Sequence, residues 1–244
     1  MPATSILSLN IEGDNHLNRV TKLLQNKKPD IFCVQEIFKD DLHIFEQLLH
    51  VRAQFVPLFR VEFPNDFRLS TRGEWGIALF SKKNVASLSM HAYAGSLNHV
   101  PVCESDPNHT NRVVLVAKIG TDQQFFYVAT THFTWTNHGA VSELQHQHMD
   151  GMLKALWPYT PLVLTGDFNA PRGKSVFSRL ANRYKDNIPP EITTTIDQKL
   201  HRSPGIQFVV DGLFTTPQLT VNHVEVIDSV SDHQAVFSIV ETPL

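Results

Sequence analysis

Polar side chains that could bind phosphate or activate water follow short apolar runs along the chain. The sharpest example is the segment 165–169 (Thr-Gly-Asp-Phe-Asn), which comes directly after Leu-Val-Leu at 162–164. In an extended chain Asp167 and Asn169 point to the same face, so that a carboxylate and an amide would meet one substrate atom. A base beside an orienting amide suits an attacking water. The alternative interpretation is an Asx turn after a strand.

A second group lies near the end of the chain, where Ser231, Asp232 and His233 precede the last apolar run. Adjacent residues of an extended segment face opposite ways, so one side chain would reach a metal ion and the other a phosphate. Asp211 follows the apolar residues 208–210. Its carboxylate would accept the second ring N–H of His233, which fixes the tautomer and raises the basicity of the ring.

The apolar patterns around these residues predict strands and helices in alternation. We expect strands at 6–9, 30–34, 76–80, 113–119, 125–131, 161–164, 207–213, 221–227 and 235–240, helices at 15–28, 42–49 and 141–156, and long loops at 94–111 and 184–205. Strand ends are where ligand sites of layered α/β proteins collect. The polar residues at or just beyond these ends are Asn10, Glu36, His132, Asp167, Asn169, Asp211, Asp232 and His233.

Composition and charge set the class of protein. The chain has 244 residues, of which 42% are hydrophobic and 18% charged, as in a soluble globular protein, and its length predicts a single domain spanning residues 1–244. A net charge of −3 gives no global signature of nucleic-acid binding. Residues 172–202 nevertheless carry seven basic and three acidic side chains, a local charge of +4. This segment would bind a polyanion or form a solvated face, and we favour the solvated face.

Other features exclude whole classes of function. Cys33 lies in an apolar run and Cys103 is the only other cysteine, so we expect reduced thiols rather than a disulfide framework. His146 and His148 are two apart on a predicted helix, which is wrong for shared zinc ligation. We see neither a signal peptide nor an apolar stretch approaching 18 residues, and therefore expect a cytoplasmic protein without a transmembrane segment. We also expect a monomer.

Six short motifs, in order along the chain, resemble those of the endonuclease/exonuclease/phosphatase superfamily. They are Ser8-Leu9-Asn10, Val34-Gln35-Glu36, Thr131-His132-Phe133, Gly166-Asp167-Phe168-Asn169, Val210-Asp211 and Ser231-Asp232-His233. Each motif is short, but the ordered set is specific and spans nearly the whole chain. The resemblance implies a deoxyribonuclease I-like α/β (α+β) four-layer sandwich, in which two packed mixed β-sheets are flanked by helices. Periodicity alone does not choose this fold over a doubly wound sheet.

The resemblance also implies a metal site. Glu36 is expected to bind Mg²⁺, or Mn²⁺, together with Asn10 and Asp232, either directly or through water. The chemistry agrees, because a small hard cation takes oxygen ligands and keeps several waters.

The same resemblance assigns the remaining catalytic roles. Asp167, steadied by Asn169, would activate or position the water, while His132 and His233 would donate to phosphate oxygens and Asp211 would orient His233. Arg112 opens a strand and is a candidate contact for the substrate phosphate, with an ordinary strand-edge charge as the alternative.

The substrate is less well defined than the chemistry. The patterns that inositol 5-phosphatases and abasic-site endonucleases carry before the penultimate Asp are missing from residues 205–211. The segment 166–177 looks nearer to the deadenylase, tyrosyl-DNA phosphodiesterase 2 and general-nuclease branches. We therefore favour a phosphoric ester hydrolase that cuts phosphodiester bonds of nucleic acid. The alternatives are a phosphatase or lipid phosphodiesterase, sphingomyelinase-like or inositol phosphatase-like, and more remotely a catalytically silent binding module.

Overall fold

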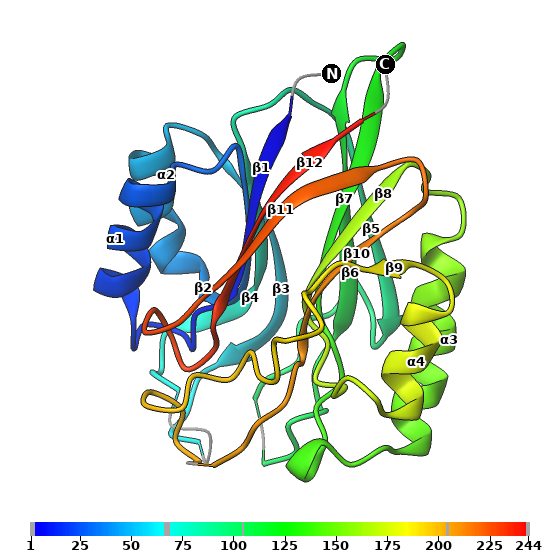
Figure 1. Ribbon diagram of the computed structural model, residues 1–244. Coiled ribbons are helices and arrows are strands. Elements are labelled where there is room, and N and C mark those ends of the chain that lie inside the picture. Colours follow the sequence, from blue (N-terminus) through cyan, green and yellow to red (C-terminus); the bar gives the residue numbers. More distant parts are fainter. Residues whose placement is uncertain (1–2, 66–68, 104, 204, 243–244) are drawn as a thin grey trace.

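The computed structural model describes residues 3–65, 69–103, 105–203 and 205–242. One sheet contains β1 (Thr4–Asn10), β2 (Ile31–Phe38), β3 (Ala53–Val61), β4 (Gly73–Ser81), β11 (Thr220–Ile227) and β12 (Ala235–Glu241). The other contains β5 (Val85–Ala94), β6 (Arg112–Gly120), β7 (Phe125–His132), β8 (Leu162–Asp167), β9 (Lys185–Asp186) and β10 (Asp211–Thr215). Helices α1 (Leu17–Lys27) and α2 (Leu42–Leu49) cover the first sheet, and α3 (Glu143–Leu156) and α4 (Ser175–Ala181) cover the second (Figure 1).

Within the described residues, two six-stranded sheets pack face to face, in the orders β11-β12-β1-β2-β4-β3 and β5-β6-β7-β8-β10-β9. The neighbours are antiparallel except for one central pair in each sheet, β1 with β2 and β7 with β8. Two mixed sheets between helices confirm the sandwich that the resemblance implied.

Three apolar layers hold the sandwich together. Residues such as Ile6 and Val128 fill the space between the sheets, while Phe32 and Phe45 pack between the first sheet and its helices. A third cluster, with Met149 and others, lies between the second sheet and α3 and α4. Each layer forms because the strands alternate their side chains between two faces, and both faces of each sheet are covered.

One buried polar bridge connects the two sheets. Gln35 is fully buried, and its Nε2 donates to Ser8 Oγ at 3.3 Å and to Thr130 Oγ1 at 3.0 Å. Ser8 and Gln35 belong to β1 and β2, whereas Thr130 lies on β7 of the other sheet. The bridge therefore joins the two central parallel pairs directly beneath their carboxyl ends.

The structure corrects several of the predicted elements. Strands β3 and β5 and helix α4 had no predicted counterpart, and residues 207–210 do not form a strand, because β10 begins only at Asp211. The hairpin of β6 and β7 and helix α2 agree with their predicted ranges. Neither Cys33 nor Cys103 forms a disulfide among the described residues. In the described ranges, helices long and apolar enough to cross a membrane are absent.

Candidate active site

Asn10 connects the polar residues of the two sheets. It closes β1, and its Nδ2 donates to Glu36 Oε1 at 2.9 Å and to Asp167 Oδ2 at 3.1 Å. Its amide oxygen accepts the backbone N–H of Glu12 at 3.1 Å. In this arrangement Asn10 positions one carboxylate from each sheet, and its role as a metal ligand stays a prediction.

Glu36 reaches the site from a β-bulge in β2. The pairing with β4 shifts register between Gln35 and Ile37, and Glu36 itself has a φ of 61°. A non-glycine residue in the left-handed region costs on the order of 1–3 kcal/mol, and such strain is concentrated at functional sites. The bulge takes Glu36 out of the regular alternation of the strand and directs it toward Asn10.

Asp167 is placed by an unusually close approach of β7 and β8. Gly166 has a φ of 137°, and a Cβ there would lie 2.1 Å from the carbonyl oxygen of Thr131, so that glycine is required. After Asp167 the chain turns, because Asn169 has a φ of 47° and its N–H donates to Asp167 Oδ1 at 2.8 Å. The predicted extended geometry is therefore wrong. The Asx turn brings the amide to the carboxylate, with Asn169 Nδ2 at 3.3 Å from Asp167 Oδ2.

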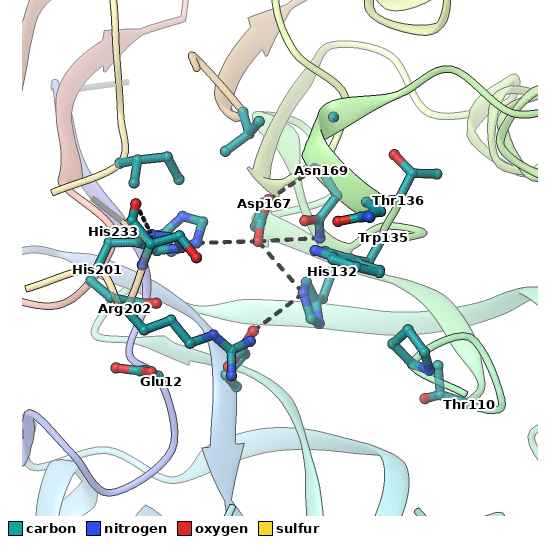
Figure 2. A pocket seen from close by; sticks show the side chains of 18 of the residues that line it. Glu12, Thr110, His132, Trp135, Thr136, Asp167, Asn169, His201, Arg202 and His233 are labelled. Carbon is teal, nitrogen blue, oxygen red and sulfur yellow. Dashed lines mark hydrogen bonds and ion pairs between the residues drawn. The ribbon is translucent and has the colours of Figure 1, made fainter. Parts of the chain in front are cut away.

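The carboxylate of Asp167 lies between two imidazoles (Figure 2). His132 Nε2 lies 3.5 Å from Asp167 Oδ2 and 3.5 Å from Glu36 Oε1, and His233 Nε2 lies 3.8 Å from Asp167 Oδ2. Burial alone would raise the pKa of Asp167, but the charge of His233 and the hydrogen bond of His132 outweigh burial and hold this pKa well below its usual range. Asp167 therefore remains an ionised acceptor that can orient a water.

His132 and Arg112 are linked through the backbone. Arg112 is buried, and its Nη1 donates to the carbonyl oxygen of His132 at 3.2 Å, while its Nη2 donates to Pro107 O at 3.0 Å and to Asn108 Oδ1 at 3.1 Å. Arg112 lines the pocket described below, and its Nε has no hydrogen-bond partner among the described residues. Its direct contact with a substrate phosphate stays a prediction, because most of the guanidinium supports this loop.

His233 forms the hydrogen bond that its sequence context predicted. Its Nδ1 pairs with Asp211 Oδ2 at 2.9 Å, and the backbone N–H of Asp211 in turn donates to Thr195 Oγ1 at 3.0 Å. Burial would lower the pKa of His233, but the charges of Asp211 and Asp167 raise it well above its ordinary value. A charged imidazole therefore faces Asp167 through Nε2, ready to donate to an anionic ligand.

Asp232 and Glu36 are two carboxyl groups of the site whose pKa values are raised by burial. Ser231 Oγ donates to Asp232 Oδ1 at 3.1 Å, yet burial raises the pKa of Asp232 to about 6. Burial also raises the pKa of Glu36, and the negative charge of Asp232 adds to that increase. A hard divalent cation would stabilise both ionised forms, so this donor set fits Mg²⁺.

Two further sets of side chains lie close enough to share a cation. The ligand atoms of Glu36, His132 and Asp167 lie within 4.8 Å of one another, as do those of Asp167, Asp211 and His233. In both sets an imidazole already pairs with a carboxylate, which favours proton and phosphate chemistry there. Glu36 belongs to both the predicted metal set and the first of these clusters.

The site lies in a cavity of about 400 Å³. The predicted residues that line it are Glu36, Arg112, His132, Asp167, Asn169, Asp232 and His233. Lining residues that the sequence did not single out include Glu12, Trp135, His201 and Arg202. These four lie outside the strands and helices, where no apolar period could have marked them. Phe208 also lines the pocket, from the segment that was predicted as a strand. Figure 2 shows Arg202 extending into the pocket between Glu12 and His132.

Asp197 organises the loop that carries His201 and Arg202. The Asp197 carboxylate accepts the N–H groups of Lys199 at 2.9 Å and Leu200 at 3.0 Å, and its own N–H donates to the carbonyl of Asp232 at 2.8 Å. The predicted long loop is therefore fastened to the backbone of the site itself.

The other basic residues of the segment 172–202 make contacts elsewhere. Arg172 pairs with Asp186, Arg179 pairs with Asp150, and the Arg183 guanidinium stacks on Trp157 at 3.9 Å from the ring centre. Among the residues that the structure describes, none of Arg172, Lys174, Arg179 and Arg183 lines the pocket. The interpretation of this segment as a solvated face stays a prediction, and Arg202 differs from these four residues because it lines the pocket.

Residues 7–233 match the model of the Endonuclease/Exonuclease/phosphatase family. The chain therefore belongs to this family. It is 27% identical to Nocturnin of Drosophila melanogaster over 218 residues, which cover 82% of this chain and 31% of that protein. The chain thus spans about a third of the length of this relative.

Solved structures share the fold at low identity. A mannosyl-6-phosphatase of Bacteroides thetaiotaomicron superposes with a TM-score of 0.71 at 17% identity, covering 99% of this chain and 100% of the other. ANGEL2, a 2′,3′-cyclic phosphatase in complex with adenosine-2′,3′-vanadate, superposes with a TM-score of 0.73 at 13% identity, covering 99% and 96%.

Proposed function

We propose that this protein is a Mg²⁺-dependent phosphodiesterase that hydrolyses phosphodiester bonds of nucleic acid by in-line attack of water. The observation that carries the proposal is the meeting of Asn10 and Glu36 from one sheet with His132 and Asp167 from the other, 2.9–3.5 Å apart in successive contacts. Carboxylates for a hard cation beside donors for an anion suit phosphoester hydrolysis.

Each side chain has a defined task in this proposal. Glu36 and Asp232 would hold Mg²⁺, which when bound neutralises charge on the phosphate. Asp167 accepts a hydrogen bond from the attacking water and so aims it, while Asn169 fixes the carboxylate. Because its pKa is low, Asp167 contributes orientation more than proton affinity.

The two histidines supply the complementary donors. His233 carries a proton because Asp211 and Asp167 raise its pKa, and its Nε2 faces the carboxylate side of the pocket. His132 Nε2, from the other sheet, lies 3.5 Å from the same Asp167 Oδ2 and 3.5 Å from Glu36 Oε1. Both donate to non-bridging oxygens as negative charge increases on the phosphate, which is where one donor is worth the most.

The size of the cavity favours a substrate end over a duplex. About 400 Å³ is in the range of sites that enclose a small ligand. The same size supports a second candidate, a phosphatase acting on a small phosphoester, as the names of the mannosyl-6-phosphatase and the cyclic phosphatase suggest. A lipid phosphodiesterase remains an alternative without an observation of its own.

A substrate panel tests the proposal. The wild type and Asp167→Asn would be incubated with single-stranded DNA, RNA, duplex DNA, mannose 6-phosphate, sphingomyelin and an inositol phosphate, with Mg²⁺ and with excess chelator. We expect the wild type to cleave a single-stranded nucleic acid in a metal-dependent reaction. The Asp167→Asn variant should lose this activity. Release of phosphate from the sugar phosphate alone would select the phosphatase, and full turnover in chelator would refute the metal role.

A further inference from the structure

Trp135 is a large apolar side chain that the fold leaves uncovered inside the pocket. It is 40% exposed, lies three residues after His132 in the sequence, and lines the same cavity. Most aromatic side chains of this chain are buried in the sandwich, as Phe133 is two positions earlier. An indole that lines a cavity instead of packing in the core is available to a ligand.

The backbone around Trp135 is held in place by hydrogen bonds. Gln145 Nε2 donates to the carbonyl of Thr134 at 2.8 Å, and Asn108 Nδ2 donates to the carbonyl of Trp135 at 3.1 Å. Asn108 is itself fixed by Arg112. The indole is therefore presented by a prearranged loop, and binding would cost little ordering of the chain.

The segment that carries Trp135 is closely packed and has no charged side chain of its own, although Asp106 and Arg112 line the same cavity from a neighbouring segment. Residues 133–139 (Phe-Thr-Trp-Thr-Asn-His-Gly) contain no carboxylate, lysine or arginine. A Cβ on Gly139 would come within 2.5 Å of Pro171 and 3.1 Å of Phe208, so Phe208 packs tightly against this turn. Thr136 and Asn137 line the pocket next to the indole and offer neutral hydrogen-bonding groups.

The pocket thus has two chemically different sides. Figure 2 shows Glu12, His201 and Arg202 on one side of Asp167 and His132, and Trp135 with Thr136 on the other. The charged part of a phosphoester belongs with the charged side chains. The neutral remainder of the substrate would lie against the indole.

We propose that Trp135 stacks on a nucleobase of the substrate and thereby selects nucleotides over other phosphoesters. This inference rests on the proposed phosphodiesterase function and names the group beside the scissile phosphate. A nucleobase fits because it has a flat face for the indole and polar edges for a neutral group such as the Asn137 amide, which an acyl chain would leave unpaired. A hexose ring also stacks on indole, and the test separates the two.

The kinetic arm compares two substrates that share the phosphodiester: a dinucleoside monophosphate and its counterpart in which one base is absent. Loss of a stacking partner costs about 5- to 150-fold in kcat/KM. We expect Trp135→Ala to lower kcat/KM by this factor on the complete substrate and by less than about twofold on the abasic substrate. Trp135→Phe should restore most of the rate. Trp157→Ala is the matched control, because Trp157 is exposed but lies outside this cavity.

A binding arm keeps this inference separate from the proposed chemistry. Adenosine 5′-monophosphate, ribose 5-phosphate and mannose 6-phosphate would be titrated calorimetrically into the wild type and Trp135→Ala. We expect the adenosine nucleotide to bind more tightly than ribose 5-phosphate, and this preference to disappear in Trp135→Ala. The nucleobase assignment would be overturned if the wild type bound the two ribose compounds equally tightly. It would also be overturned if Trp135→Ala weakened the binding of mannose 6-phosphate as much as that of the adenosine nucleotide. If the wild type preferred the adenosine nucleotide but cleaved no phosphodiester, the proposed function would be refuted and the nucleobase inference would stand.

Discussion

The pair formed by Asp211 and His233 allows a double-mutant test of the site. The Nδ1 atom of His233 lies 2.9 Å from Asp211 Oδ2, both side chains are buried, and Asp211 is the largest of the charges that raise the pKa of His233. Replacing Asp211 with Asn keeps the volume and an acceptor oxygen but removes that charge. The proton on His233 is then held less firmly, because burial lowers its pKa.

The expected losses follow from what each group does. His233→Ala removes a donor to the charged phosphate, which is worth about 10²–10³-fold in kcat. Asp211→Asn should cost the same or less, because Asp211 reaches the substrate only through the imidazole. The double variant should then be within about threefold of His233→Ala, the scatter expected when no further interaction is lost.

The assay is kcat with a saturating phosphodiester, accompanied by thermal unfolding of every variant. His91→Ala serves as the control, since that ring pairs with Tyr159 and does not line the pocket. If the two losses of kcat multiply in the double variant, for example about tenfold from Asp211→Asn times about 10²-fold from His233→Ala, the two residues act independently. That result would refute the argument. Melting temperatures that fall in step with activity would assign both residues to stability.

Three further predictions concern other parts of the site. Glu36→Gln should raise the Mg²⁺ concentration needed for half-maximal rate while leaving the melting temperature nearly unchanged, and an unfolded variant would show a structural role instead. Arg202→Glu should weaken binding of single-stranded nucleic acid and reduce its logarithmic salt slope by about 1, whereas Arg183→Glu should leave that slope unchanged; equal slopes for both variants would remove Arg202 from the substrate site. Gly166→Ala should destabilise the fold by about 1–3 kcal/mol in denaturant unfolding, because its Cβ would meet the Thr131 carbonyl at 2.1 Å; wild-type stability would contradict the close approach.

The sequence predicted the central strands well because their signals are strong. Strands β6 and β7 are nearly continuous apolar runs joined by a turn, and Asp167 ends β8 directly after such a run, with Asn169 two residues further on. Apolar runs mark buried strands, and polar residues at their ends mark where the strands leave the core. The same rule missed β5, whose residues are mostly half-buried or exposed at a sheet edge, and β3, whose Pro57 opposes a strand assignment.

The details that aim the side chains lie beyond sequence patterns. Glu36 depends on a bulge that its residue type does not indicate. Asn169 depends on a left-handed turn, which asparagine favours but which the sequence offered only as the alternative to an extended chain. Glu12, with a φ of 51°, lines the pocket from a loop in the same unusual region. Arg202 looked like one of several basic residues in a solvated segment, and only the anchoring of its loop through Asp197 separates it from Arg179.

The site depends on the relative position of the two sheets, since each sheet supplies half of it. Asn10, which also holds Glu36 of its own sheet at 2.9 Å, bridges the sheets through its 3.1 Å contact with Asp167, and Gln35 bridges them below through Thr130 at 3.0 Å. A slide of one sheet over the other would break both bridges together, because they join the same two parallel pairs. The packed core between the sheets resists such a slide. The glutamine of the Gln35-Glu36 motif therefore helps to fix the distance at which the proposed catalytic groups of the two sheets meet.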